Sequence, residues 1–177
     1  MTTTAVIFHS GYGHAQRVAQ FVADGAQAQL IAIDADGNIS EADWATLDAA
    51  DAIVFGSPTY MGMVSWQFKK FADASSKRWF SGAWKDKVAG GFTISGSPSG
   101  DKLSTIQYFI TLAMQHGMVW VGQPAMNDGH ITRIGSNSGV MAQVGPTSPA
   151  ADIPQGDLDT AKAYGERVRL LAQRMGA

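Results

Sequence analysis

Near the start of the chain, a short apolar run leads into small, flexible and hydroxyl-bearing residues that are suited to binding an anion. Residues 5–8 (Ala-Val-Ile-Phe) predict a strand, and residues 10–14 (Ser-Gly-Tyr-Gly-His) predict a turn. From Ala15 to Ala26 the apolar residues recur at the spacing of one helical face. A turn at this junction directs free backbone N–H groups and the positive end of the helix dipole to one point, which predicts a phosphate site.

The side chains of this turn limit how it can hold a phosphate. No Lys or Arg precedes Arg17, so the anion would be bound mainly by the backbone and by Ser10, Tyr12 and His14. The sequence lacks the Gly-Lys-Ser/Thr of a P-loop, and Gln16 replaces the third glycine of a dinucleotide fingerprint. A turn that only connects the strand to the helix remains the alternative interpretation.

Two further loops share this chemistry. Residues 56–63 (Gly-Ser-Pro-Thr-Tyr-Met-Gly-Met) follow a third predicted strand, and residues 93–100 (Thr-Ile-Ser-Gly-Ser-Pro-Ser-Gly) end a fourth. Because ligands of open parallel sheets bind beyond the carboxyl ends of the strands, we expect the three loops to form one site. Neutral loops supply no acid–base pair, but their backbone groups can approach and hydrogen-bond a flat heteroaromatic ring.

The pattern of apolar residues predicts strands that alternate with helices. The expected strands are residues 5–8, 30–33, 52–55, 88–94 and 118–121, which are apolar enough for a parallel sheet covered on both faces. The expected helices are residues 15–26, residues 103–113 and three segments whose caps are Ser40, Ser65 and Asp157. This alternation is typical of a doubly wound α/β domain. Residues 122–154, with five Gly and four Pro, predict a long functional or partner-contacting loop.

The composition predicts one soluble domain spanning residues 1–177. A formal net charge of -2 gives no basis for nucleic-acid binding, and no apolar run is long enough for membrane insertion. The absence of cysteine excludes disulfides and thiol catalysis, and the scattered histidines predict no metal site. Residues 1–4 lead directly into a strand, so we expect no signal peptide and a cytoplasmic location. Trp44 and Trp66 are predicted to be core residues.

Four segments together resemble a known family. They are Ser-Gly-Tyr-Gly-His at 10–14, Gly-Ser-Pro-Thr-Tyr-Met-Gly at 56–62, Ser-Gly-Ser-Pro-Ser-Gly at 95–100 and Gln-His-Gly-Met at 115–118. The chain resembles the flavodoxin-like flavoproteins and, among them, the WrbA-type NAD(P)H:quinone oxidoreductases. The resemblance implies a single FMN-binding domain with a five-stranded parallel sheet in the order 2-1-3-4-5. It also implies non-covalent FMN, NAD(P)H as co-substrate, and a homo-oligomer that is a dimer or a tetramer.

The resemblance also assigns roles to individual residues. His116 would lie beside the flavin as the catalytic residue, and Trp79 and Tyr12 would line the substrate side. The residues expected to bind the cofactor are Ser10, Gly11, Tyr12, Gly13, His14, Ala15, Pro58, Thr59, Tyr60, Met61, Gly62, Ser95, Gly96, Ser97, Pro98, Ser99, Gly100 and His116. The family often carries Arg-Phe where this chain has Tyr60-Met61, and a bulkier residue in place of Gly11.

The implied function is a two-electron reduction of quinones by NAD(P)H through FMN. Hydride would pass from the nicotinamide to the flavin and then to a quinone-like acceptor on the same ring face, in a ping-pong sequence. Two alternatives are a flavodoxin-type carrier of single electrons and a flavin-binding module without turnover. For His116 the alternative is a structural histidine at the end of the fourth helix, where the helix dipole favours its charged form.

Overall fold

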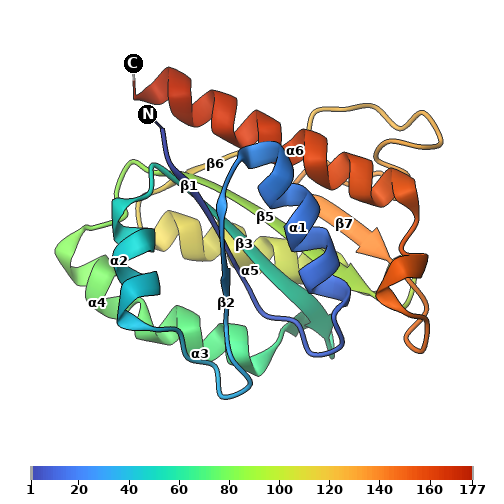
Figure 1. Ribbon diagram of the computed structural model, residues 1–177, viewed down its shortest axis with the longest axis horizontal. Coiled ribbons are helices and arrows are strands. Elements are labelled where there is room, and N and C mark those ends of the chain that lie inside the picture. Colours follow the sequence, from blue (N-terminus) through green and yellow to red (C-terminus); the bar gives the residue numbers. More distant parts are fainter. Residues whose placement is uncertain (1, 177) are drawn as a thin grey trace.

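The computed structural model describes residues 2–176, and its centre is a parallel sheet with the strand order β2-β1-β3-β5-β6 (Figure 1). These strands are β1 (Thr4–Phe8), β2 (Gln29–Ala32), β3 (Ala52–Tyr60), β5 (Val88–Ser95) and β6 (Val119–Trp120). They correspond to the five expected strands, and their expected order is confirmed. Two short strands are additional: β4 (Met63–Val64) pairs antiparallel with β3, and β7 (Val140–Gln143) pairs parallel with β5.

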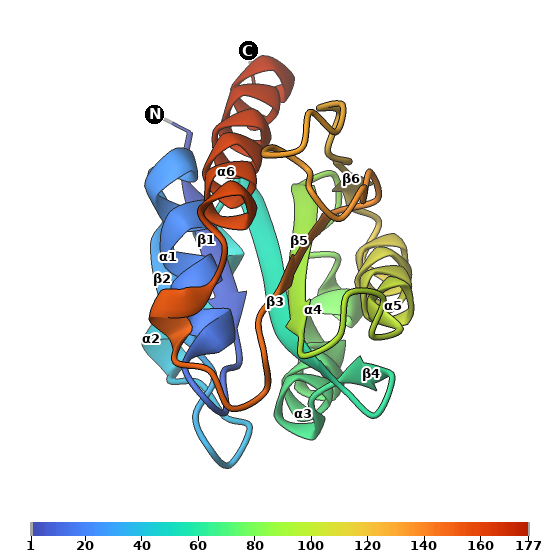
Figure 2. The same cartoon turned by 90° about the vertical axis from the view of Figure 1, so that its right-hand side faces the viewer.

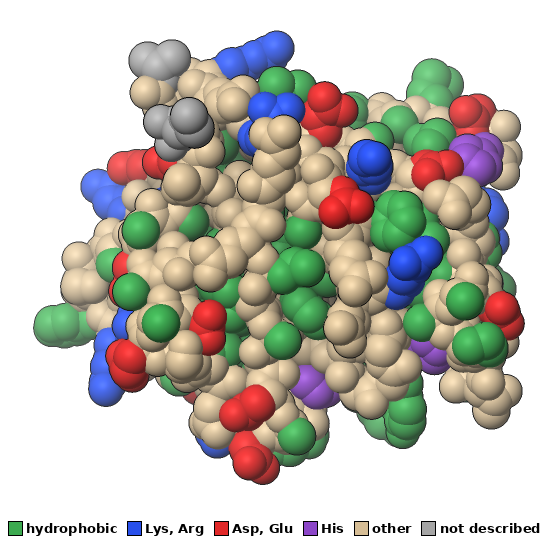
Figure 3. Space-filling model, in the orientation of Figure 1, with side chains coloured by type: hydrophobic (Ala, Val, Ile, Leu, Met, Phe, Trp, Pro, Cys, Tyr) green, Lys and Arg blue, Asp and Glu red, His purple; other side chains and the backbone are tan. Residues whose placement is uncertain are grey.

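Helices cover both faces of the sheet, as expected (Figure 2). One face carries α1 (His14–Ala26) and α6 (Gln155–Met175), and the other carries α2 (Glu41–Ala49), α3 (Trp66–Ala74) and α5 (Lys102–Gln115). The short helix α4 (Ser76–Ser81) follows α3, and a 3-10 turn at Ala150–Asp152 precedes α6. No helix within residues 2–176 is long and apolar enough to cross a membrane. On the face seen in Figure 3, acidic and basic side chains are interspersed.

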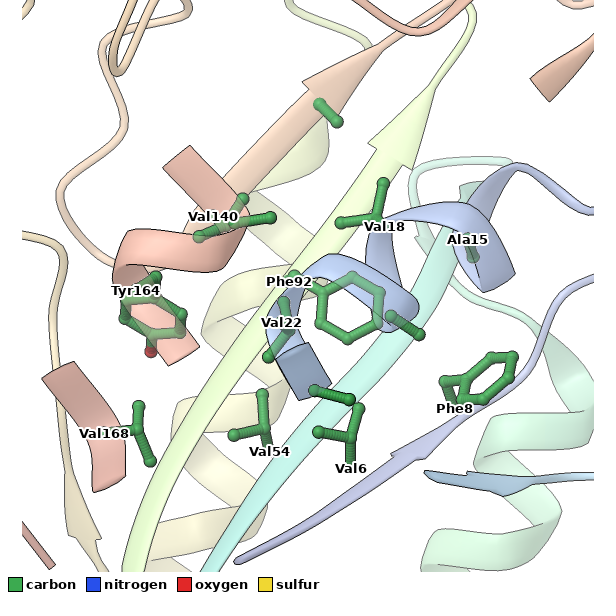
Figure 4. Close-up of a cluster of buried hydrophobic side chains, with 14 of the residues drawn as sticks. Val6, Phe8, Ala15, Val18, Val22, Val54, Phe92, Val140, Tyr164 and Val168 are labelled. Carbon is green, nitrogen blue, oxygen red and sulfur yellow. The ribbon is translucent and has the colours of Figure 1, made fainter. Parts of the chain in front are cut away.

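The core on the α1–α6 face is built mainly from small and β-branched residues around three aromatic rings, those of Phe8, Phe92 and Tyr164. Val6, Val54 and Phe92 project from neighbouring strands toward Val22 of α1, and all four are fully buried (Figure 4). Tyr164 of α6 is also buried, and its hydroxyl donates to the carbonyl oxygen of Val121 and accepts from the Gly91 N–H group, at 2.6 and 3.1 Å. The one polar group of this ring is therefore satisfied inside the core.

Helix starts follow the expected caps with one exception. The Ser40 hydroxyl accepts from the Asp43 N–H group in a capping box, and the Ser65 hydroxyl accepts from the N–H group of Phe68. The cap predicted at Asp157 is wrong, because α6 begins at Gln155 after Pro154. Asp157 instead lies buried in the first turn of α6, where its carboxylate binds the Arg133 guanidinium at 2.8 Å.

Two other expectations need correction. The segment 122–154 contains β7, whose residues Val140 and Ala142 are buried against the sheet, so it is more ordered than a loop. Trp44 is buried as predicted, but Trp66 is 61% exposed. Phe68, two residues after Trp66, is buried on the inner face of α3. Residues two apart on a helix point in nearly opposite directions, so Trp66 points outward.

The contact between α1 and α6 depends on two glycines. A Cβ atom on Gly25 would lie 1.9 Å from the Lys162 carbonyl oxygen, and one on Gly165 would lie 2.0 Å from the Val22 carbonyl oxygen. Each helix therefore packs directly on the backbone of the other. This close approach fixes the position of α1, whose first turn lies at the carboxyl edge of the sheet (Figure 1).

We predict that Gly165→Ala lowers the free energy of unfolding by about 2–3 kcal/mol, because the new methyl group overlaps backbone that cannot move independently. Urea denaturation followed by circular dichroism measures this change. The control is Gly176→Ala, whose Cβ atom would lie 3.6 Å from its nearest neighbour, and it should change stability by less than about 0.5 kcal/mol. Equal stability of Gly165→Ala and the unmodified protein would contradict the packing described.

Candidate functional site

A pocket of about 450 Å³ lies where β1, β3 and β5 end at the carboxyl edge of the sheet. All three loops singled out in the sequence contribute to it. Of the expected site residues, the pocket is lined by Ser10, Gly11, Tyr12, His14, Ala15, Pro58, Thr59, Tyr60, Met61, Ser95 and Gly96. Ile94, Val144 and Pro146 complete the lining. None of these side chains is an acid, a lysine or an arginine, so the wall is neutral apart from His14.

The turn after β1 presents unpaired donors to the pocket. Gly13 is the N-cap of α1 and has a φ of 83°, a conformation that favours glycine, and no side chain caps the helix. The first N–H groups of α1 therefore have no partner within the helix. The Ser10 hydroxyl is buried and has no hydrogen-bond partner among the described residues. The His14 side chain, which also lines the pocket, has its Nε2 atom 2.8 Å from the Ser148 carbonyl oxygen, and this contact anchors the turn.

Tyr60 spans the mouth of the pocket. A Cβ atom on Gly11 would lie 2.7 Å from the Tyr60 hydroxyl, so this glycine makes room for the phenol. The Tyr12 ring packs edge-on against the Tyr60 ring, with centroids 6.3 Å apart. Burial raises the pKa of Tyr60, which keeps its hydroxyl protonated. The chain thus pairs a small residue at position 11 with a large neutral one at position 60.

The loop after β3 turns back sharply beyond Tyr60. Met61 and Gly62 have φ angles of 47° and 78°, as in the primed two-residue turns of β-hairpins, and Tyr60 pairs with Met63 across the turn. The Met61 side chain is fully exposed at the pocket rim. Below it, the Thr59 hydroxyl lies 2.8 Å from the hydroxyls of both Thr93 and Thr105, which fixes this wall.

The loop after β5 is wound around a buried lysine that the sequence analysis did not identify. The Lys102 ammonium donates to the Ser95 hydroxyl and to the carbonyl oxygens of Ser97 and Pro98. Burial lowers the pKa of Lys102 to about 8. From β7, the Gln143 side chain donates to the Gly96 carbonyl oxygen at 3.0 Å. The backbone of this wall is therefore held from behind by two side chains.

Several expected residues do not line the pocket. Gly13 and Gly62 shape their turns but are not among its lining residues, and the same holds for Ser97, Pro98, Ser99 and Gly100. Trp79 lies on α4, outside the pocket, with 52% of its surface exposed. The structure therefore supports a smaller site within one chain than the resemblance implies.

The expectation that His116 lies beside the ligand does not hold within the chain. Helix α5 begins at Lys102 next to the pocket and runs away from it for 14 residues, a length of about 21 Å, before His116 follows. The imidazole is buried, with Nε2 2.9 Å from the Ser75 hydroxyl and its ring 4.4 Å from the Trp84 ring. Burial lowers the pKa of His116, so the ring is held neutral as a structural group.

Most of the residues that the sequence analysis missed lie at the end of β7 or directly after it. The alternation of buried and half-buried positions from Val140 to Val144 is a strand pattern, but the surrounding glycines and prolines suggested a loop. The sequence did not indicate that Lys102 is buried, because a lysine that follows an aspartate at the start of a helix is ordinarily exposed to solvent.

Comparisons with known proteins agree with this geometry. The family model of the NADPH-dependent FMN reductases matches residues 10–132. A Pseudomonas aeruginosa protein named flavodoxin FldP is 48% identical over the full length of both chains. A Syntrophobacter fumaroxidans protein named NAD(P)H dehydrogenase (quinone) is 31% identical and covers 96% of this chain and 97% of its own.

Solved structures show the same relationship. The flavodoxin, WrbA-like protein from Agrobacterium tumefaciens is 54% identical, with a TM-score of 0.84 over 98% of this chain and 99% of its own. A flavodoxin from the domain Archaea, 18% identical, has a TM-score of 0.64 over 97% of this chain and 99% of its own, which shows the shared fold. The chain therefore belongs to the NADPH-dependent FMN reductase family and is a WrbA-type, flavodoxin-like flavoprotein.

Proposed function

We propose that the chain binds one FMN without a covalent bond and uses it to transfer two electrons from NAD(P)H to a quinone-like acceptor. The observation that carries this proposal is the buried Ser10 hydroxyl without a partner, next to the uncapped first turn of α1. Such a set of neutral donors fits a phosphomonoester and leaves no donor without a partner once the anion is bound. The neutral lining of the three loops fits the ring system of the same molecule.

In this proposal each loop has a separate task. Ser10 and the N–H groups of residues 11–15 hold the phosphate, with Gly13 allowing the turn. The segments 58–61 and 95–96 flank the ring, and Tyr12 and Tyr60 close one side of the pocket. Bound FMN would supply the redox chemistry, while the protein orients the ring and limits the access of water. Neither His116 nor Trp79 reaches this pocket within one chain, so neither is given a catalytic task.

A carrier of single electrons is the second candidate. It is favoured by the 48% identity to a protein named flavodoxin FldP. The fully exposed Met61 at the rim of the pocket is also compatible with electron transfer to a docked protein. A formal net charge of -2 gives little long-range electrostatic steering, which favours the small-molecule acceptor.

The expected homo-oligomer remains part of the proposal. Trp79 and Phe80 are large apolar side chains on α4, with exposed fractions of 52% and 87%. Neighbouring exposed residues of this size are a surface that another subunit can cover. The cytoplasmic location likewise remains an expectation from the sequence.

We predict that Ser10→Ala weakens FMN binding about tenfold, because one hydrogen bond to a charged phosphate is lost. Quenching of flavin fluorescence measures the dissociation constant. Riboflavin, which lacks the phosphate, should bind the variant and the unmodified protein equally. The control Ser81→Ala removes an exposed hydroxyl on α4 and should leave FMN binding unchanged. Unchanged FMN affinity in Ser10→Ala would contradict the assignment of the phosphate.

We further predict rapid two-electron turnover when FMN-loaded protein is mixed anaerobically with NADH or NADPH and then with benzoquinone. Stopped-flow absorbance at the flavin band follows both half-reactions. Full bleaching by the nicotinamide and full recovery with the quinone support the reductase. Reduction that stops after one electron would instead support the carrier, and no reduction by either nicotinamide would refute the use of NAD(P)H.

A further inference from the structure

Lys102 is a buried cation directly behind one wall of the pocket. Its side chain is inaccessible to solvent, which is rare for lysine. All three ammonium hydrogens have acceptors, at 2.8 Å from the Ser95 hydroxyl, 2.8 Å from the Ser97 carbonyl oxygen and 2.9 Å from the Pro98 carbonyl oxygen. Ser95 itself lines the pocket, so a single side chain separates the charge from the ligand.

None of these acceptors carries a negative charge. Among residues 2–176, no carboxylate forms an ion pair with Lys102. Asp157 of α6 faces the ammonium from farther away, and Arg133, which also faces it, already binds the Asp157 carboxylate at 2.8 Å. The positive charge of Lys102 is therefore solvated by neutral dipoles but is not neutralised.

Burying a charge without a counter-charge is costly, and three neutral hydrogen bonds offset only part of this cost. A negative charge in the adjacent pocket would offset more of it. The FMN phosphate is expected on residues 10–15, the loop after β1, and not next to Lys102. The phosphate therefore does not directly offset the cost of burying the lysine charge. The part of the ligand that faces Ser95 and Gly96 is the part on which Lys102 acts.

We propose that Lys102 is a positioning residue that stabilises the negative charge that bound FMN gains on reduction. The inference rests on FMN binding as proposed above. When a reduced nicotinamide gives up a hydride, two electrons and one proton pass to the flavin, and the nicotinamide is left oxidised. The flavin then carries one additional negative charge at neutral pH. Lys102 stays protonated and favours that charge through the wall of the pocket.

The test compares Lys102→Met with the unmodified protein. Methionine keeps much of the apolar stem and removes the charge. The variant should bind oxidised FMN within about threefold of the unmodified protein and reduced FMN about tenfold more weakly. A tenfold weaker binding of reduced relative to oxidised FMN equals a midpoint potential lower by about 30 mV for a two-electron couple, measured by equilibrium dye titration. An unchanged potential in a variant that still binds FMN would overturn the proposal.

Lys87 provides the matched control. Its ammonium also donates to three acceptors, the carbonyl oxygens of Leu47, Asp48 and Ala50. Lys87 directly precedes β5, so it lies at the other edge of the sheet. Lys87→Met should destabilise the fold without changing the potential. If it shifts the potential as much as Lys102→Met does, the effect is not specific to the pocket and the proposal fails.

A second measurement serves if Lys102→Met does not fold. Burial lowers the pKa of Lys102 to about 8. The repulsion of Arg133 also lowers this pKa, whereas the attraction of Asp157 raises it. Above this pH the lysine of the oxidised protein is neutral, and the charge gained on reduction raises its pKa again. A tenfold coupling corresponds to a pKa rise of about one unit on reduction, so proton uptake per electron pair in the unmodified protein should rise from about one near pH 7 to about one and a half between pH 8 and pH 9. Uptake of one proton throughout would refute the proposal, whereas failure to bind FMN would refute the proposed function itself.

Discussion

The site depends on one helix that begins without a side-chain cap. Serine hydroxyls cap the first turns of α2 and α3, but α1 follows Gly13 and has no side-chain cap, and the nearby Ser10 hydroxyl is buried without a partner among the described residues. Leaving these donors unpaired costs free energy, which an anion at the same point recovers. The glycine contacts between α1 and α6 hold the helix in place, so the donors stay fixed at the carboxyl edge of the sheet.

The charge distribution around the pocket follows from the same constraint. In the proposed arrangement backbone dipoles bind the phosphate, so the lining needs no basic side chain, and none of its residues is a lysine or an arginine. The nearby cation, Lys102, lies behind the wall and forms hydrogen bonds to the loop 95–98 from inside. A cation in this position acts on the electronic state of a ligand more than on its capture from solution.

The sequence predicted the strands and the three loops, because buried strands and glycine-rich turns are local patterns, whereas the strand order came from the family resemblance. It did not predict β7, whose alternation lies among glycines and prolines, or the burial of Lys102, which depends on how the loop closes. The distance of His116 from the pocket of its own chain could have been expected from the fold. The helices that connect parallel strands run opposite to the strands. His116, which follows α5, must therefore lie at the amino edge of the sheet, away from the three loops at the carboxyl edge.

The central claim, that the uncapped start of α1 binds the phosphate of FMN, is tested most directly by NMR. The backbone amide resonances of residues 11–15 should shift downfield in ¹H–¹⁵N spectra when FMN is added, and inorganic phosphate alone should shift the same signals in the same direction. The amides of the capped first turn of α2 (Glu41–Ala49) should not respond. Unshifted signals for residues 11–15 in FMN-saturated protein would contradict the account.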